Sequence, residues 1–376
     1  MSPPFPRSEY EARVAAAQSE MDRSGLAALW LTCEADICYF TGFLTRFWAS
    51  PSRPWFVVLP AQGAPVAVIP EIGAWLMAQT GIQDIRTWPA PRPGDDGVSL
   101  LADALNACGG PVGTPQGPES HLHMPLSDFA SLQTQMRVPI VPDGGLVAGL
   151  RAIKSAREID AIEAACAVAG RAFDRVGEIA REGVSLAQVF RDFQGLLLQE
   201  GADWVGYLSG GAGQGGYTDV ISPARETPLA FGDVLMLDTG AVLNGYYCDY
   251  DRNYSVGPPG DELRTAHARL IEAAKAALDA IRPGQRACDL WQVMARITGQ
   301  EHASGRMGHG LGLQLTEGLS LMAGDASALQ AGMVVTLEPV IETAQGRLLV
   351  HEEVCVVTEQ GARPLTRFAG PDLPVV

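Results

Sequence analysis

The chain has 376 residues, of which 47% are hydrophobic and 19% are charged. This length and composition exclude a disordered chain and predict a globular protein with two domains. The net charge of −16 arises from 43 acidic and 27 basic residues without a long run of like charge, which argues against nucleic acid or an anionic membrane as a partner.

The first 150 residues alternate between helix-like and strand-like segments. Ser8 and Glu11 have the spacing of a capping box and open a helical period that ends at Gly25. Turns rich in Pro and Gly separate the apolar, strand-like runs that follow at 26–32, 55–59 and 66–69. We interpret residues 1–150 as an α/β domain.

A second capping box, at Ser155 and Glu158, opens a long predicted helix. Another helix is predicted over 261–282, where Pro283 stops it. The strand-like runs around these helices are VLMLD, YYCDYDRNYSV, MVVTLEP and LLVHEEVCVV. Residues 151–376 are therefore expected to form an α+β domain, in which one antiparallel sheet carries helices on one side.

Acidic residues interrupt these apolar strands. Asp238 ends the run VLMLD, and Glu338 ends the apolar part of MVVTLEP. A carboxylate in such a place is unfavourable unless it is paired or bound to a metal. Asn244-Gly245 predicts a hairpin turn, and we expect the returning strand, 246–256, to bring Asp249 opposite Asp238.

Two further residues complete this pattern. Glu352 lies in LLVHEEVCVV, and the glycines of GRMGHGLG surround His309 and allow close backbone approach. Each residue taken alone also fits an ordinary turn, edge or surface position. Four carboxylates and one imidazole that converge in a core, however, require cations such as divalent Mn, Co, Fe or Zn. Two such ions balance four carboxylates and acidify a bridging water.

The number and spacing of the cysteines indicate in which cellular compartment the protein is expected. The chain has seven cysteines, which include no Cys-x-x-Cys pair, and this is typical of reduced, buried thiols. The N-terminal segment MSPPFPRSEYEARV lacks an apolar signal core. No apolar stretch reaches the roughly 18 residues that a membrane-spanning helix needs. A cytoplasmic protein without a membrane partner is therefore expected.

Four segments, LMLDTGAVLNGYYCDYDRNYSVG, GHGLGLQLTE, GMVVTLEP and HEEVCVVTEQG, together resemble the pita-bread metallopeptidase family. This family includes prolidase, aminopeptidase P, methionine aminopeptidase and creatinase. The spacing of Asp238 and Asp249, and the segments RAIKSAREIDAIEAA and YFTGF, are similar to the prolidase-like branch. The resemblance implies a C-terminal pita-bread catalytic domain, a creatinase-like α/β N-terminal domain and a homodimer.

The resemblance also implies roles for individual residues. The implied ligands of two divalent metal ions, with manganese or cobalt placed before iron or zinc, are Asp238, Asp249, His309, Glu338 and Glu352. Glu338 is further expected to take the proton from the attacking water. Because the N-terminal domain can reach the partner's site in dimers of this family, the candidates for binding the substrate are Arg46, Trp48 and Arg53.

Two histidines that assist catalysis in the peptidase branch are missing. One lies upstream of the first aspartate ligand in that branch, and the place of the other is taken by Thr316, which donates a hydrogen bond but is no acid at neutral pH. Asp251 replaces a threonine of the relatives. We expect it to support the metals or to relay protons, unless it only pairs with an arginine.

The functional prediction is a dinuclear-metal hydrolase that uses a metal-bridging water to cleave a small amide or C–N bond. An Xaa-Pro dipeptidase or aminopeptidase acting on short peptides is the first interpretation, with Glu338, Asp251 and Thr316 as catalytic residues. The alternative is a small-molecule C–N hydrolase or a dimethylsulfoniopropionate-type lyase of the same fold. A non-catalytic binding module is a third interpretation, against which the presence of all five ligand candidates argues.

Overall fold

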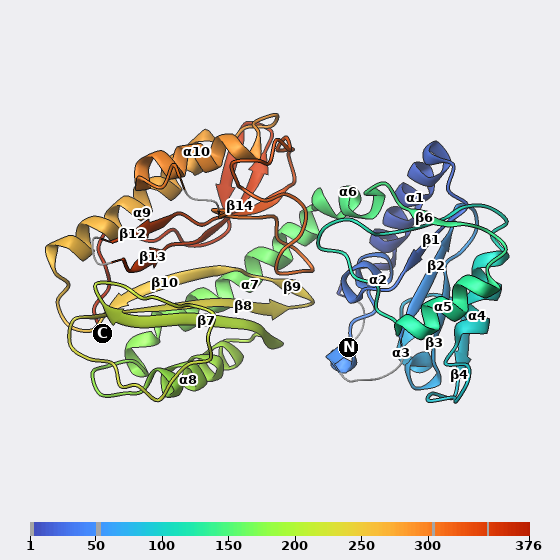
Figure 1. The fold of residues 1–376 in the computed structure, drawn as a ribbon, viewed down its shortest axis with the longest axis horizontal. Helices are drawn as coiled ribbons and strands as arrows, with labels where there is room; N and C mark the ends of the chain where they lie inside the picture. Colours follow the sequence, from blue (N-terminus) through green and yellow to red (C-terminus); the bar gives the residue numbers. More distant parts are fainter. Residues whose placement is uncertain (1–3, 50–53, 303–304, 344–345) are drawn as a thin grey trace. The chain divides into compact units, whose positions relative to one another are not determined.

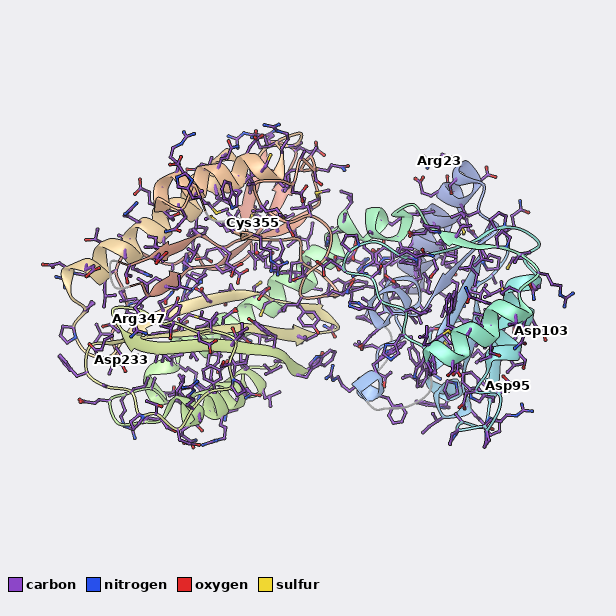
Figure 2. The ribbon with its side chains drawn as sticks, in the orientation of Figure 1. Arg23, Asp95, Asp103, Asp233, Arg347 and Cys355 are labelled. Carbon is purple, nitrogen blue, oxygen red and sulfur yellow. The ribbon has the colours of Figure 1, made fainter. Side chains whose placement is uncertain are left out.

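The computed structural model of the chain describes residues 4–49, 54–302, 305–343 and 346–376. They form two compact units, Met1–Arg151 and Ala152–Val376 (Figure 1). In Figure 2 the side chain of Cys355 lies inside the C-terminal unit, whereas Arg23 and Asp103 lie at the surface of the N-terminal unit. All seven cysteines are free thiols. Within the described ranges, no helix combines the length and apolarity needed to cross a bilayer.

The N-terminal unit is built on a six-stranded sheet with the order β4-β3-β2-β1-β5-β6. The strands are β1 Ala28–Leu31, β2 Phe56–Pro60, β3 Val66–Pro70, β4 Asp84–Trp88, β5 Val112–Thr114 and β6 Ile140–Pro142. The helices are α1 Arg7–Ser24, α2 Glu34–Thr41, α3 Ala74–Ala78, α4 Val98–Asn106, α5 Leu126–Gln135 and α6 Leu146–Ala152, with 3-10 turns η1 Arg46–Ala49 and η2 Glu71–Gly73. The buried side chains of Trp30, Phe56 and Trp88 belong to the core of this unit.

The first helix starts differently from the prediction. Its N-cap is Pro6, and no side chain caps its N-terminus. The predicted capping box of Ser8 and Glu11 is wrong because the helix already begins at Arg7, which places Ser8 inside the first turn. The predicted end is confirmed, since Gly25 adopts the left-handed conformation with a φ of 69°, which favours glycine.

The described residues of the C-terminal unit form three sheets. Its strands are β7 Trp204–Gln214, β8 Asp233–Leu243, β9 Tyr246–Tyr247, β10 Tyr250–Ser255, β11 Val334–Leu337, β12 Val340–Glu342, β13 Leu348–Val350, β14 Glu353–Thr358 and β15 Gly361–Pro364. Strands β7 to β10 form one sheet, β11, β14 and β15 a second, and β12 and β13 a third. The expectation of one antiparallel sheet is therefore wrong.

Helices cover both outer sides of these strands (Figure 1). They are α7 Ala156–Asp174, η3 Val176–Glu178, α8 Leu186–Gln199, α9 Asp261–Ala280 and α10 Ala287–Thr298. Helices α7 and α8 pack on β8 and β7, whereas α9 contacts β11, β12, β13 and β15. Placement of all helices on one side was thus also wrong, because each group of strands buries its apolar face under its own helix pair. The capping box of Ser155 and Glu158 is confirmed.

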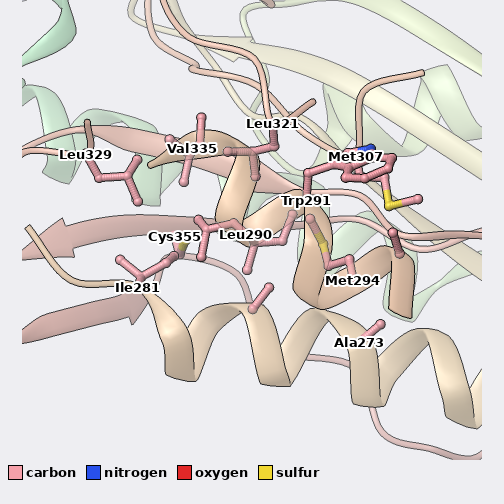
Figure 3. Packing of buried hydrophobic residues seen from close by; sticks show 14 of the residues in the cluster. Ala273, Ile281, Leu290, Trp291, Met294, Met307, Leu321, Leu329, Val335 and Cys355 are labelled. Carbon is pink, nitrogen blue, oxygen red and sulfur yellow. The ribbon is translucent and has the colours of Figure 1, made fainter. Parts of the chain in front are cut away.

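A hydrophobic core between α9, α10, β11 and β14 anchors the loop that carries His309 (Figure 3). Met307 and Leu321 belong to this core and are at most 1% exposed. The Met307 N–H donates to the Leu321 carbonyl at 2.7 Å, and the Leu321 N–H donates to the Gly308 carbonyl at 2.8 Å. The imidazole therefore projects from a backbone that is held by the core on both sides.

Candidate metal centre

The hairpin of β8 and β10 brings three aspartates to one face of a sheet. Its turn is confirmed, since Asn244 and Gly245 both have positive φ angles, of 55° and 86°. The expectation that Asp249 lies opposite Asp238 is wrong, because the register pairs Asp238 with Asp251. A two-residue turn dictates this register, and Asp249 lies two positions nearer the turn on the same face.

Glycines around His309 let two backbone segments approach very closely. A Cβ atom on Gly308 would lie 2.2 Å from the Thr336 carbonyl oxygen, and one on Gly310 would lie 2.1 Å from the Glu317 carbonyl oxygen. The His309 N–H donates to Thr336 Oγ1 at 3.1 Å. Any larger residue at either glycine would push the imidazole away from its neighbours.

The contacts of the imidazole define its tautomer. His309 Nδ1 lies 3.0 Å from the Gly310 carbonyl oxygen, which only accepts hydrogen bonds, so Nδ1 carries the proton. Nε2 then presents its lone pair 3.2 Å from Asp249 Oδ2 and 4.0 Å from Glu352 Oε1. These three ligand atoms lie within 4.8 Å of one another, and all three residues are buried. A histidine held in this way is typical of a metal ligand.

Asp238 and Glu338 complete the acidic cluster. Asp238 Oδ2 accepts a hydrogen bond from Ser209 Oγ at 3.3 Å, and Glu338 follows β11 directly. Burial and the charge of Asp238 raise the pKa of Glu338 to about 8. Burial and the charges of Asp249 and Glu338 raise the pKa of Glu352 well above its usual value. The carboxylates therefore share one electrostatic environment, in which burial and mutual repulsion outweigh the positive charges nearby.

Several oxygen atoms of this cluster have no hydrogen-bond partner in the described part of the chain. They are Asp238 Oδ1, Asp251 Oδ2 and Glu352 Oε1, and all three are buried. Buried polar atoms are nearly always satisfied, so these atoms require a partner other than the protein. Carboxylate oxygens beside one imidazole nitrogen suit divalent transition metals. The residues present therefore fit a metal centre.

The next residue along the chain belongs to a different environment. Glu353 accepts hydrogen bonds from Arg252 Nη2 at 3.0 Å and from the Ala369 N–H at 2.7 Å. His351 Nε2 lies 3.0 Å from Glu353 Oε1, and Thr366 donates to its Oε2. Burial alone would raise the pKa of Glu353, but Arg252 and His351 bring it down to about 2. This carboxylate is satisfied entirely by the protein.

Asp251 connects the two environments. Its Oδ1 accepts the Glu352 N–H at 3.2 Å and lies 3.6 Å from His351 Nδ1. Burial raises the pKa of Asp251, while His351 and Arg252 lower it. The side chain of Asp251 is not the carboxylate that pairs with Arg252. Arg252 donates instead to the backbone carbonyl of Asp251 and to the carboxylate of Glu353.

Residues predicted to contact the substrate lie in several places. Thr316 is half-buried and accepts a hydrogen bond from Arg306. Arg46 is exposed in η1, whereas Trp48 is 8% exposed and packs against the rings of Trp55 and His123. Arg53 lies outside the described residues.

Three residues near the cluster were missed by the sequence analysis. Ser209 pairs with Asp238 across β7 and β8, and Tyr207 O–H donates to Ser209 Oγ at 2.7 Å. No local signal reveals this pairing, because β7 and β8 are separated by a long connection. Arg306 was within reach of the sequence analysis, since it lies three residues before His309 in the segment GRMGHG.

Comparison with known proteins places this geometry in a family. The model of metallopeptidase family M24 matches residues 160–359, and that of the creatinase/prolidase N-terminal domain matches residues 13–153. A probable dipeptidase PepE of Mycobacterium tuberculosis is 30% identical over 370 residues, which are 95% of this chain and 94% of that protein. An Xaa-Pro dipeptidase of Pyrococcus furiosus is 30% identical over 229 residues, 59% of this chain and 65% of the relative.

Solved structures extend this likeness to the whole fold. Dipeptidase PepE from Mycobacterium ulcerans has a TM-score of 0.83 at 30% identity, with 99% of each chain covered. The Xaa-Pro dipeptidase from Bacillus anthracis has a TM-score of 0.84 at 22% identity, with 98% of this chain and 100% of the other covered, and it shows the shared pita-bread fold. The chain belongs to metallopeptidase family M24, in its prolidase and aminopeptidase P branch, and is a metal-dependent hydrolase.

Proposed function

We propose that this enzyme is an Xaa-Pro dipeptidase with two divalent metal ions, manganese or cobalt before iron or zinc. The proposed ligands are Asp238, Asp249, His309, Glu338 and Glu352. The observation that carries the proposal is the set of buried oxygens on Asp238 and Glu352 without a hydrogen-bond partner in the described chain. Four carboxylates match the charge of two divalent ions, which supports a dinuclear rather than a mononuclear centre.

The bound cations supply Lewis acidity toward the scissile carbonyl and lower the pKa of water. Glu338 is half-buried, whereas Asp238, Asp249 and Glu352 are buried. Glu338 is thus the most exposed of these four residues, and we assign it the proton of the attacking water. Its tendency to hold a proton, with a pKa of about 8 before cations bind, matches that role.

Asp251 and Thr316 support this chemistry in different ways. Asp251 Oδ1 accepts the Glu352 N–H, so Asp251 acts as a positioning residue for a proposed ligand rather than as a group that touches the substrate. Thr316, fixed by Arg306 at 3.2 Å, orients the substrate at the entrance of the site. In a homodimer, Arg46, Trp48 and Arg53 of the N-terminal domain, proposed as residues 1–150, would contact the substrate in the partner's catalytic domain, proposed as 151–376.

A non-peptidase activity is the second candidate. Thr316 stands where the peptidase branch has a histidine, and His351 is engaged by Glu353 at 3.0 Å. Among the described histidines, His309 thus faces the proposed ligands Asp249 and Glu352, whereas His351 approaches Asp251. This shortage of acids for a leaving amine is the observation that supports a small-molecule C–N hydrolase or a dimethylsulfoniopropionate-type lyase as the second candidate.

One experiment separates these candidates. Metal-free protein is reconstituted with Mn²⁺ or Co²⁺, its metal content is measured, and released amino acid is followed with a panel of Xaa-Pro dipeptides. We expect two ions per chain and release of proline. Fewer than about one ion per chain contradicts the dinuclear centre, and full metal loading without release from any dipeptide favours the non-peptidase activity. We also propose that the enzyme is cytoplasmic and forms a homodimer. Light scattering of the same sample measures its molar mass and tests the homodimer.

A further inference from the structure

Arg306 lies three residues before His309, on a fixed piece of backbone. It is exposed and directly precedes Met307, which is 1% exposed and packed in the core. The Met307 N–H is bonded to the Leu321 carbonyl at 2.7 Å. The guanidinium is held at its other end, because Nη2 donates to Thr316 Oγ1 at 3.2 Å.

The side chain of Arg306 lies beside the backbone that carries His309. Its Nη2 donates to Thr316 Oγ1, and the next residue, Glu317, donates its N–H to the Gly310 carbonyl at 2.9 Å. The guanidinium therefore lies next to the segment that holds a proposed metal ligand, while Arg306 remains exposed.

The two arginines near the cluster are used differently. Arg252 donates to the Glu353 carboxylate and to three carbonyl groups, those of Asp251, Glu352 and Arg367. In the described part of the chain, by contrast, no carboxylate forms an ion pair with Arg306, and Thr316 accepts only one of the five N–H groups that a guanidinium offers. The guanidinium of Arg306 thus keeps its charge and further N–H groups that can donate hydrogen bonds to a ligand.

We propose that Arg306, oriented by Thr316, binds the C-terminal carboxylate of the substrate and selects dipeptides with a free C-terminus. This inference rests on the proposed function. In a dipeptide the carboxylate lies only about one residue spacing, ~3.8 Å, from the scissile carbonyl, so its partner must stand beside the metal ligands. Four carboxylates already neutralise two divalent ions, and a further anion there requires a cation of its own. Arginine binds a carboxylate through two parallel hydrogen bonds.

The test compares an acid with its neutral amide. Metal-loaded wild type, Arg306→Gln and Arg306→Lys are assayed with Ala-Pro and with Ala-Pro amide. We expect Arg306→Gln to raise KM for Ala-Pro about 10- to 100-fold, as loss of a charged hydrogen bond predicts, with kcat within about threefold and the amide unaffected. Arg306→Lys should recover part of the loss, because lysine keeps the charge without the fork. Arg296→Gln, at an exposed arginine of α10, is the matched control.

Binding measured by calorimetry separates this inference from the proposed function. L-Proline should bind wild type more tightly than prolinamide, and Arg306→Gln should remove the preference. If this holds while no Xaa-Pro dipeptide is hydrolysed, the proposed function fails and the carboxylate site stands. Three results would overturn the inference. Equal losses for acid and amide would assign Arg306 to positioning Asp249 or Thr316, and unchanged binding by the variant would remove its role. Absence of proline binding to wild type would remove the site itself.

Discussion

Glu352 and Glu353 are neighbours in sequence, and both are buried, yet they belong to opposite electrostatic environments. Glu353 is surrounded by Arg252, His351 and Thr366, and its pKa falls to about 2. Glu352 keeps an oxygen without a partner in the described chain, and its pKa is raised well above the usual value. The comparison teaches that a folded protein can compensate one buried carboxylate by its own groups and leave the next without a partner, where we propose that cations compensate it.

This difference follows from the strand geometry. Residues 351 and 352 lie between β13 and β14, and successive side chains on extended backbone point to opposite sides. His351 and Glu353 therefore face the side that carries Arg252, whereas Glu352 faces His309, with its Oε1 4.0 Å from Nε2. One step along the backbone separates a structural ion pair from a proposed metal ligand.

The largest expected effect is a loss of turnover when Glu352, the buried acid with an unsatisfied oxygen, is replaced by glutamine. Glu352→Gln should lower turnover on the order of 1,000-fold and reduce the metal content, because a proposed ligand of the Lewis-acidic cations is lost. Its metal-free form should be at least as stable as metal-free wild type, since an uncompensated buried charge disappears. Metal analysis and denaturant unfolding measure both. A Glu352→Gln protein with full metal content would place the ligand elsewhere.

The matching change at the neighbour should act on stability. Glu353→Gln leaves the half-buried Arg252 without its anionic partner, and we expect a loss of about 3 kcal/mol in the free energy of unfolding. Urea unfolding of the metal-free proteins compares this variant with Glu352→Gln as its isosteric control. Equal stabilities of the two variants would show that the two environments do not differ.

Removal of metal should change the pH dependence of stability. Glu338 has an unfolded-state pKa near 4.5 and a folded-state pKa of about 8 before cations bind. The stability that its proton contributes is thus fully present below pH 4.5 and is lost as the pH rises through 8. Metal-free protein should lose about 3–4 kcal/mol between pH 5 and 8, and metal-loaded protein should show the opposite trend, because deprotonated ligands bind cations better. Thermal unfolding with and without chelator measures the two trends.

The smallest effect is expected at the residue that joins the two environments. Asp251→Asn keeps the shape that accepts the Glu352 N–H but removes the charge, so metal affinity should fall about 10- to 100-fold, as for other residues that orient ligands. Stability should change little, because His351 retains Glu353 as a partner. Titration of metal-free protein with Mn²⁺ measures the affinity, and an unchanged value would limit Asp251 to a structural role.

The sequence by itself determined most local features of the site. Acids in apolar strands, the Asn244-Gly245 turn and the glycines around His309 are short-range patterns with local physical causes. The same patterns contain the register that pairs Asp238 with Asp251, which the initial expectation for Asp249 overlooked. The capping box of Ser155 was likewise readable, because it involves residues only three positions apart.

Only the tertiary structure decided which acids are satisfied. Glu353 meets Arg252 and Ala369, and Asp238 meets Ser209, through contacts between segments far apart in the chain. The division into three sheets has the same origin, since the partner of each strand depends on which apolar faces helices cover. These long-range contacts decide which buried charges are paired, and a local sequence pattern does not contain the positions of the distant partners.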